Sequence, residues 1–187
     1  MPAQIVSYWP GGPLDYIARA ALITAVRLGH QITVWSHTPQ PDDVPEGVEL
    51  RDALEVLDPH DIRPENQHLI PDLMRWELLA LNPGAIFMPP DFMLIAPLQV
   101  PETGYLIGLE SPTHVAPAPI ALPANSPELA MLRALAADPS PIPPWMDETA
   151  RAELEAADPP VPVGHLPWGT LGATALTHAL RETGRLA

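Results

Sequence analysis

The 187-residue chain carries nine basic residues, all of them Arg, against 23 acidic residues, which gives a formal net charge of −14. This balance argues against nucleic acid or an anionic membrane surface as a partner, because both attract basic surfaces. With 47% hydrophobic residues, 17% charged residues and no Cys, residues 1–187 are expected to form a single domain with a sizeable core, in which any metal site must use Asp, Glu or His.

The first 36 residues predict a strand, a helix and a second strand. Residues 3–9 have strand composition, and the turn GGP that follows places Pro13 where a helix can begin. Apolar residues recur at helical spacing from Leu14 to Leu28, and residues 31–36 form the next strand. Such a unit normally gives a parallel pair of strands, so the fold class is α/β.

The rest of the chain gives weaker and more scattered signals. Residues 48–57 are mixed in period and stay unassigned. A helix is predicted from about Pro71 to Asn82, because proline is tolerated in a first turn. The further predicted elements are strands at 84–88, 103–110 and 114–122, and helices from Ser126, over 147–157 and over 172–183.

Five side chains could carry chemistry, and each also has a plain structural explanation. Asp72 and Arg75, three apart on one helix, could act as a ribose or base acceptor and a phosphate clamp, or form an ordinary surface ion pair. Asp91 follows a strand at the edge where α/β sheets gather ligand groups, or it shapes a turn. Trp9 could stack on a base or belong to the core. His165 could ligate a metal or be a loop residue without a specific role.

Several common signatures are missing from the sequence. There is no GxGxxG, GxxxxGK[ST], HExxH or GxSxG pattern, which makes dinucleotide-dependent, P-loop, zincin and hydrolase functions poor choices. No apolar run approaches the roughly 20 residues that span a bilayer, and no basic segment precedes an apolar one at the N-terminus. We therefore expect a cytoplasmic protein without a transmembrane segment.

Taken in order, a series of segments resembles the bacterial sugar transferases of glycosyltransferase family 32, a DXD-containing group associated with capsule and lipopolysaccharide sugars. The segments are IVSYWPGGPL, LGHQITVWS, VPEGVELRDA, PDLMRWELL, NPGAIFMPPD, ANSPELAMLRAL and WGTLGATALTHAL. The resemblance implies a GT-A-like nucleotide-sugar-binding fold, with a mostly parallel central sheet flanked by helices. It also implies a retaining hexose transfer from a nucleotide-diphosphate sugar to a glycan acceptor.

The resemblance also implies roles for individual residues. Trp9 would stack on the nucleotide base, Asp72 and Arg75 would hold the sugar and phosphate portions of the donor, and Asp91 would take the last position of the DXD motif. A divalent cation, Mn²⁺ or Mg²⁺, would bridge the diphosphate at Asp91. His165, which is a candidate metal ligand by its residue type and not by the resemblance, could join Asp91 in holding this cation.

The chain departs from this pattern where the first Asp of the DXD motif is expected, because Pro89 stands there. Two explanations stay open. Asp91 can hold a metal together with the diphosphate, since Mg²⁺ often needs only one or two carboxylates plus phosphates. Alternatively, the protein is a catalytically inactive module that binds a glycan or another protein. Apart from these two explanations, the chain could be a metabolic α/β protein whose segments match the glycosyltransferase family by accident.

Overall fold

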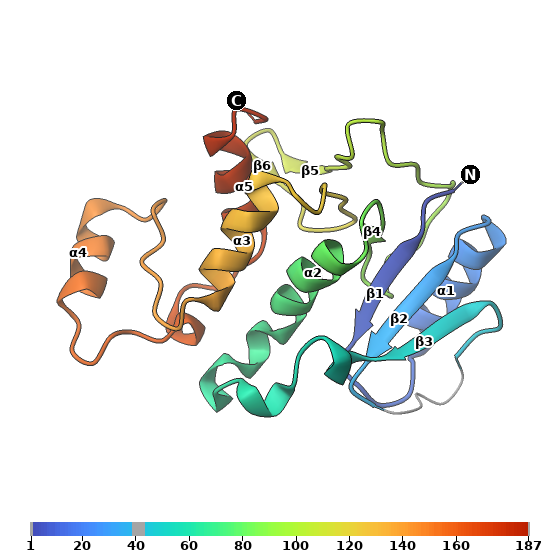
Figure 1. The fold of residues 1–187 in the computed structure, drawn as a ribbon, viewed down its shortest axis with the longest axis horizontal. Coiled ribbons are helices and arrows are strands. Elements are labelled where there is room, and N and C mark those ends of the chain that lie inside the picture. The colour runs from blue at the N-terminus through green and yellow to red at the C-terminus, as the bar shows by residue number, and fades with distance from the viewer. Residues whose placement is uncertain (1, 39–43, 187) are drawn as a thin grey trace.

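The computed structural model describes residues 2–38 and 44–186, and its centre is a four-stranded sheet. The strands are β1 (Ile5–Trp9), β2 (Ile32–Ser36), β3 (Val48–Asp52) and β4 (Ile86–Phe87). They run in the order β3-β2-β1-β4, and all three pairings are parallel (Figure 1). The expected α/β class with a parallel central sheet is confirmed.

Helices cover the sheet and continue beyond it (Figure 1). They are α1 (Tyr16–Arg27), α2 (Ile70–Leu81), α3 (Pro127–Ala137), α4 (Glu148–Ala156) and α5 (Ala173–Glu182). The starts of three helices are set by side-chain caps, because Asp15, Ser126 and Asp147 each accept a hydrogen bond from a backbone N–H in the first turn. Helix α1 therefore begins after Asp15, two residues later than the expected start at Leu14.

The strands alternate their side chains between two cores, one on each face of the sheet. Ile5 and Ile86 pack in a cluster with Leu22 of α1, whereas their neighbours Val6 and Phe87 pack in a cluster with residues of α2, α3 and α5. In contrast to the other helices, α4 buries none of its residues and lies apart from them in Figure 1.

The structure differs from the sequence-based expectation in three strands. Residues 48–52, which had stayed unassigned, form β3 at the edge of the sheet. None of the β3 residues is buried, so the apolar alternation that identifies a strand in the sequence is weak there. The strands expected over 103–110 and 114–122 are reduced to the short antiparallel pair β5 (Leu109–Ser111) and β6 (His114–Val115), with isolated bridges beside it. Pro117 and Pro119 have no N–H to donate, so a continuous ladder cannot form there.

No helix within the described ranges combines the length and the apolar character needed to cross a membrane.

Candidate functional site

The order of the strands places a candidate site between β1 and β4. The chain builds β1, β2 and β3 outward in one direction and then returns to place β4 on the other side of β1. In open α/β sheets, ligands bind outside the carboxyl ends of the strands at such a reversal point. Trp9 ends β1, and residues 88–91 continue from β4 at the same edge, so two of the expected site segments meet here.

Trp9 is held in place by the loop that follows it. Its indole Nε1 donates a hydrogen bond to the carbonyl oxygen of Gly12 at 3.0 Å, and the Gly12 N–H in turn donates to the Thr38 hydroxyl at 3.0 Å. A Cβ on Gly11 would lie 2.5 Å from the same hydroxyl, so the loop can pass Thr38 only with glycine there. The half-buried Trp9 packs against the core cluster that contains Ile5 and Leu22, and the Gly12 N–H is already engaged and is not open to a phosphate.

Arg75 is the most unusual charged residue at this edge. Its side chain is only 10% exposed, and Nη1 donates to Asp72 Oδ1 at 2.5 Å. The guanidinium carbon lies 5.3 Å from the ring centroids of both Trp76 and Phe87, the latter at the end of β4. Nε is buried without a hydrogen-bond partner.

The charge of Arg75 is thus incompletely compensated. Burial lowers its pKa below the ordinary value, while the attraction of Asp72 acts in the opposite direction. An Arg nevertheless stays protonated in proteins, so a positive charge is held in a mostly water-free position with one N–H unpaired. A site of this kind favours an anionic ligand with several acceptor oxygens, such as a phosphate.

The segment that leads into α5 covers the Asp72 side of this pair. The carbonyl oxygen of Leu171 accepts a hydrogen bond from the Trp76 indole at 3.0 Å. A Cβ on Gly172 would come within 3.5 and 3.6 Å of the two Asp72 carboxylate oxygens, so the backbone of the segment lies against this carboxylate. Residues about a hundred positions apart in sequence therefore form one wall of the site.

Asp91 lies in a tight turn after β4. The Phe92 N–H donates to the carbonyl oxygen of Pro89 at 3.1 Å, which closes the turn around Pro90 and Asp91. Asp91 is exposed and forms no hydrogen bond or ion pair with any residue that the structure describes. Its carboxylate is free for a ligand, whereas the two prolines before it offer no N–H.

His165 is exposed at the end of a short 3₁₀ helix, Val163–His165, and lines a cavity next to α4 that Asp91 does not line. Within residues 2–38 and 44–186, no three His, Asp or Glu side chains gather closely enough to hold a metal ion. A cation at Asp91 would need most of its ligands from a bound diphosphate and water, and the pairing of His165 with Asp91 stays a prediction.

Sequence reasoning missed one polar chain at the same edge of the sheet. The Tyr8 hydroxyl lies 2.9 Å from His37 Nδ1, and His37 Nε2 lies 2.8 Å from the carbonyl oxygen of Leu57. The carbonyl can only accept, so Nε2 carries the ring proton and Nδ1 accepts from Tyr8. Burial raises the pKa of Tyr8 to about 12. The sequence offered one indication of these contacts, namely that His37 directly follows the strand that ends at Ser36.

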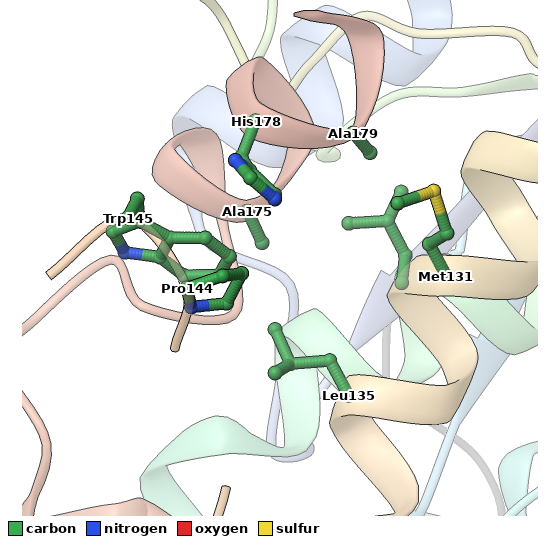
Figure 2. Close-up of a pocket in the computed structure, with 8 residues that line it drawn as sticks. Met131, Leu135, Pro144, Trp145, Ala175, His178 and Ala179 are labelled. Atoms are coloured by element: carbon green, nitrogen blue, oxygen red, sulfur yellow. The ribbon is translucent and has the colours of Figure 1, made fainter. Parts of the chain in front are cut away.

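A second hollow, between α3 and α5, is too small for a nucleotide. It has a volume of about 100 Å³ and a largely apolar wall, in which Met131 and Leu135 of α3 face His178 and Ala179 of α5 (Figure 2). The rings of Trp145 and His178 lie with their centroids 5.1 Å apart at its border. None of Trp9, Arg75 and Asp91 lines this hollow, so it is not part of the candidate site.

The parallel sheet and the helices that cover it define an α/β fold, and this fold is shared with a solved glycosyltransferase structure. A solved structure described as "PaToxG Glycosyltransferase" is similar over 97% of this chain and 70% of its own, with a TM-score of 0.60 and 15% sequence identity. The sequence matches no known protein-family profile. It also matches no curated protein. At this low identity the similarity concerns the fold.

Proposed function

We propose that the protein binds a nucleotide-diphosphate sugar between the carboxyl ends of β1 and β4 and transfers its hexose, with retention of configuration, to a glycan acceptor. The observation that carries the proposal is Arg75, a guanidinium that is 10% exposed and keeps a buried Nε without a partner. A buried cation of this kind is costly unless an anion completes its environment. The glycosyltransferase-like fold supports a diphosphate as that anion.

In this proposal each residue at the edge has a stated task. Arg75 binds the diphosphate and stabilises the negative charge that grows on it as the sugar leaves. Asp72 orients the guanidinium through the bond at 2.5 Å and offers its second oxygen to a donor hydroxyl. Trp9 stacks on the base, held by its bond to Gly12.

Asp91 is proposed as the single protein carboxylate for a divalent cation. Mn²⁺ or Mg²⁺, when bound, would neutralise charge on the diphosphate. The free carboxylate of Asp91 is compatible with this role, but one carboxylate alone does not form a metal site. We therefore expect weak metal binding in the absence of nucleotide and stronger binding in its presence.

The second candidate is a non-catalytic module that binds a glycan or a protein partner. It is favoured by one observation, namely that Pro89 stands in place of the first carboxylate, and that Pro89 and Pro90 together remove two N–H donors at the site. This candidate predicts that nucleotide sugars do not bind, which the following experiment tests.

Calorimetric titration with UDP-glucose, UDP-galactose and GDP-mannose, with and without Mn²⁺, tests the donor site. Binding is expected for at least one donor, and Arg75→Met should weaken it by about tenfold or more, because a charged hydrogen bond contributes about 1.5–3 kcal/mol. Arg133→Met is the matched control, because Arg133 forms an exposed bidentate pair with Glu77 and lies on α3. Arg75→Lys keeps the charge and tests the guanidinium geometry.

The results separate a binding role from a structural one. If Arg75→Met lowers the melting temperature but leaves donor affinity intact, the Asp72–Arg75 contact is only an ion pair. Asp91→Ala should abolish the Mn²⁺-dependent part of donor binding, and unchanged affinity in this variant would remove Asp91 from the proposed site. Absence of binding by all three donors, from a folded sample, would favour the non-catalytic module.

A further inference from the structure

A cavity of about 500 Å³ lies between α4 and the segment that leads into α5. Its walls come from α4, from the end of the Pro-rich loop before it, and from residues 161–174. Pockets for small ligands range from about 300 to 1,000 Å³, so the space suits one or two sugar rings. Trp9, Arg75 and Asp91 do not line it, and the cavity is thus distinct from the proposed donor site.

The lining combines one flat apolar surface with several polar groups. Trp168 is 99% exposed, which is unusual for the largest side chain and leaves an entire indole face open to a ligand. Asp147, Glu153 and His165 line the same space, and these residues supply two carboxylates and an imidazole. Thr170 also lines it, and its hydroxyl donates to the carbonyl oxygen of Pro167 at 2.6 Å, so the hydroxyl oxygen can accept a bond.

This set of groups matches a neutral sugar better than an anion. A pyranose offers an apolar C–H face that packs on an indole, and hydroxyls that both donate and accept hydrogen bonds. No Arg within the described part of the chain lines the cavity, and two carboxylates do, which disfavours a phosphate or a sugar acid. The Asp147 carboxylate keeps one oxygen for the ligand, because the other caps α4.

The cavity adjoins the proposed donor site through one short piece of chain. In residues 168–172, Trp168 and Thr170 line the cavity, whereas Leu171 and Gly172 lie against α2 and the Asp72 carboxylate. The two sites are therefore on opposite sides of the same segment.

We propose that this cavity binds a neutral saccharide, with Trp168 stacked on a sugar face and Glu153 and Asp147 accepting from its hydroxyls. Its assignment as the acceptor site rests on the proposed function, whereas saccharide binding itself does not. A small organic cation is the competing occupant, because an open indole beside two carboxylates also attracts positive charge.

Saturation-transfer NMR on the full chain tests the proposal, with methyl glycosides of glucose, galactose, mannose and N-acetylglucosamine, and with lactose, as probes. At least one probe should bind, and Trp168→Ala should weaken it by about tenfold, which corresponds to about 1.4 kcal/mol. The fold should survive this substitution because Trp168 is almost fully exposed. Tyr16→Ala, which removes an aromatic ring that is 86% exposed on α1, is the matched control and should have no effect.

Two further variants separate the occupants and the two sites. Glu153→Gln keeps an acceptor oxygen, so the saccharide affinity should change by less than about threefold. If putrescine or tetramethylammonium binds and Glu153→Gln abolishes that binding while no saccharide binds, the neutral-sugar assignment is overturned. It is also overturned if no probe binds or if binding survives Trp168→Ala. Trp168-dependent saccharide binding, together with no binding of UDP-glucose, UDP-galactose or GDP-mannose, would refute the donor site alone.

Discussion

Arg185→Ala is expected to destabilise the protein through Glu128, a carboxylate that is fully buried at the start of α3. Glu128 Oε1 accepts a hydrogen bond from Arg185 Nε at 2.8 Å, and Oε2 accepts one from the Tyr105 hydroxyl at 2.8 Å. The Arg185 guanidinium also lies 3.8 Å from the centroid of the Tyr105 ring. The substitution removes the only basic partner of this carboxylate among the residues that the structure describes.

The magnitude follows from these contacts. Breaking a fully buried ion pair costs about 3–5 kcal/mol, but the Arg185 side chain is 44% exposed, so solvent partly screens the interaction. One charged hydrogen bond and a partly exposed cation–π contact together suggest a loss of about 2 kcal/mol in the free energy of unfolding. For a chain of this length, the melting temperature should fall by about 4–8 °C.

Urea denaturation and calorimetry of four proteins measure this loss: the natural chain, Arg185→Ala, Glu128→Gln and the double variant. The loss from Arg185→Ala should be clearly smaller in the Glu128→Gln background, because the charge that Arg185 neutralises is gone. Arg151→Ala, an exposed position on α4, is the control and should stay within about 0.5 kcal/mol. An equal loss in both backgrounds would refute the proposed coupling.

The same carboxylate predicts a pH dependence. Burial alone raises the pKa of Glu128, but hydrogen bonds from neighbours that include Tyr105 and Arg185 lower it below the ordinary value of 4.5. Because the folded-state pKa is the lower one, the contribution is present above pH 4.5 and is lost as the pH falls through the folded-state pKa. The stability difference between the natural chain and Glu128→Gln should therefore shrink at acid pH, and a constant difference would contradict this.

Three smaller changes test other parts of the structure. Tyr8→Phe leaves His37 Nδ1 without its donor, and the free energy of unfolding measured by urea denaturation should fall by about 1 kcal/mol. An unchanged free energy of unfolding would contradict this and would mean that water replaces the hydroxyl. Asp15→Ala removes the bond of 2.7 Å that caps α1 and should cost about 1 kcal/mol by the same measurement, whereas Asp15→Asn should cost less. Pro89→Asp adds a second carboxylate near Asp91 and should strengthen Mn²⁺-dependent binding of a nucleotide sugar by about tenfold in calorimetry; an unchanged affinity would place the metal elsewhere.

The secondary structure around the candidate site was largely predictable, because its signals are local. The unit of β1, α1 and β2 follows from two short apolar runs, a turn with two glycines and a helical stripe between them. The helix that carries Asp72 and Arg75 was predicted from its spacing, and so was the proximity of these two side chains, since residues three apart share a helix face. The α/β class follows from the same local signals.

The environment of these side chains depended on the tertiary structure. An i, i+3 pair is the same in sequence whether it is exposed or buried, and only the packing of α2 against β4 places Arg75 over Phe87 and removes it from water. The order β3-β2-β1-β4, which brings the ends of β1 and β4 together, could not be derived from strand patterns, because pairing joins residues about 80 positions apart.

The sequence by itself therefore determined most of the helices, the first two strands and the residue types available for chemistry, because these depend on neighbours within a few positions. Tertiary structure alone decided which of those residues share a site. It brought Gly172 against Asp72, and it placed His165 with Trp168 around a cavity beside α4. The physical reason is that burial, an unpaired buried donor and the shape of a cavity all arise from contacts between distant segments, which no local pattern records.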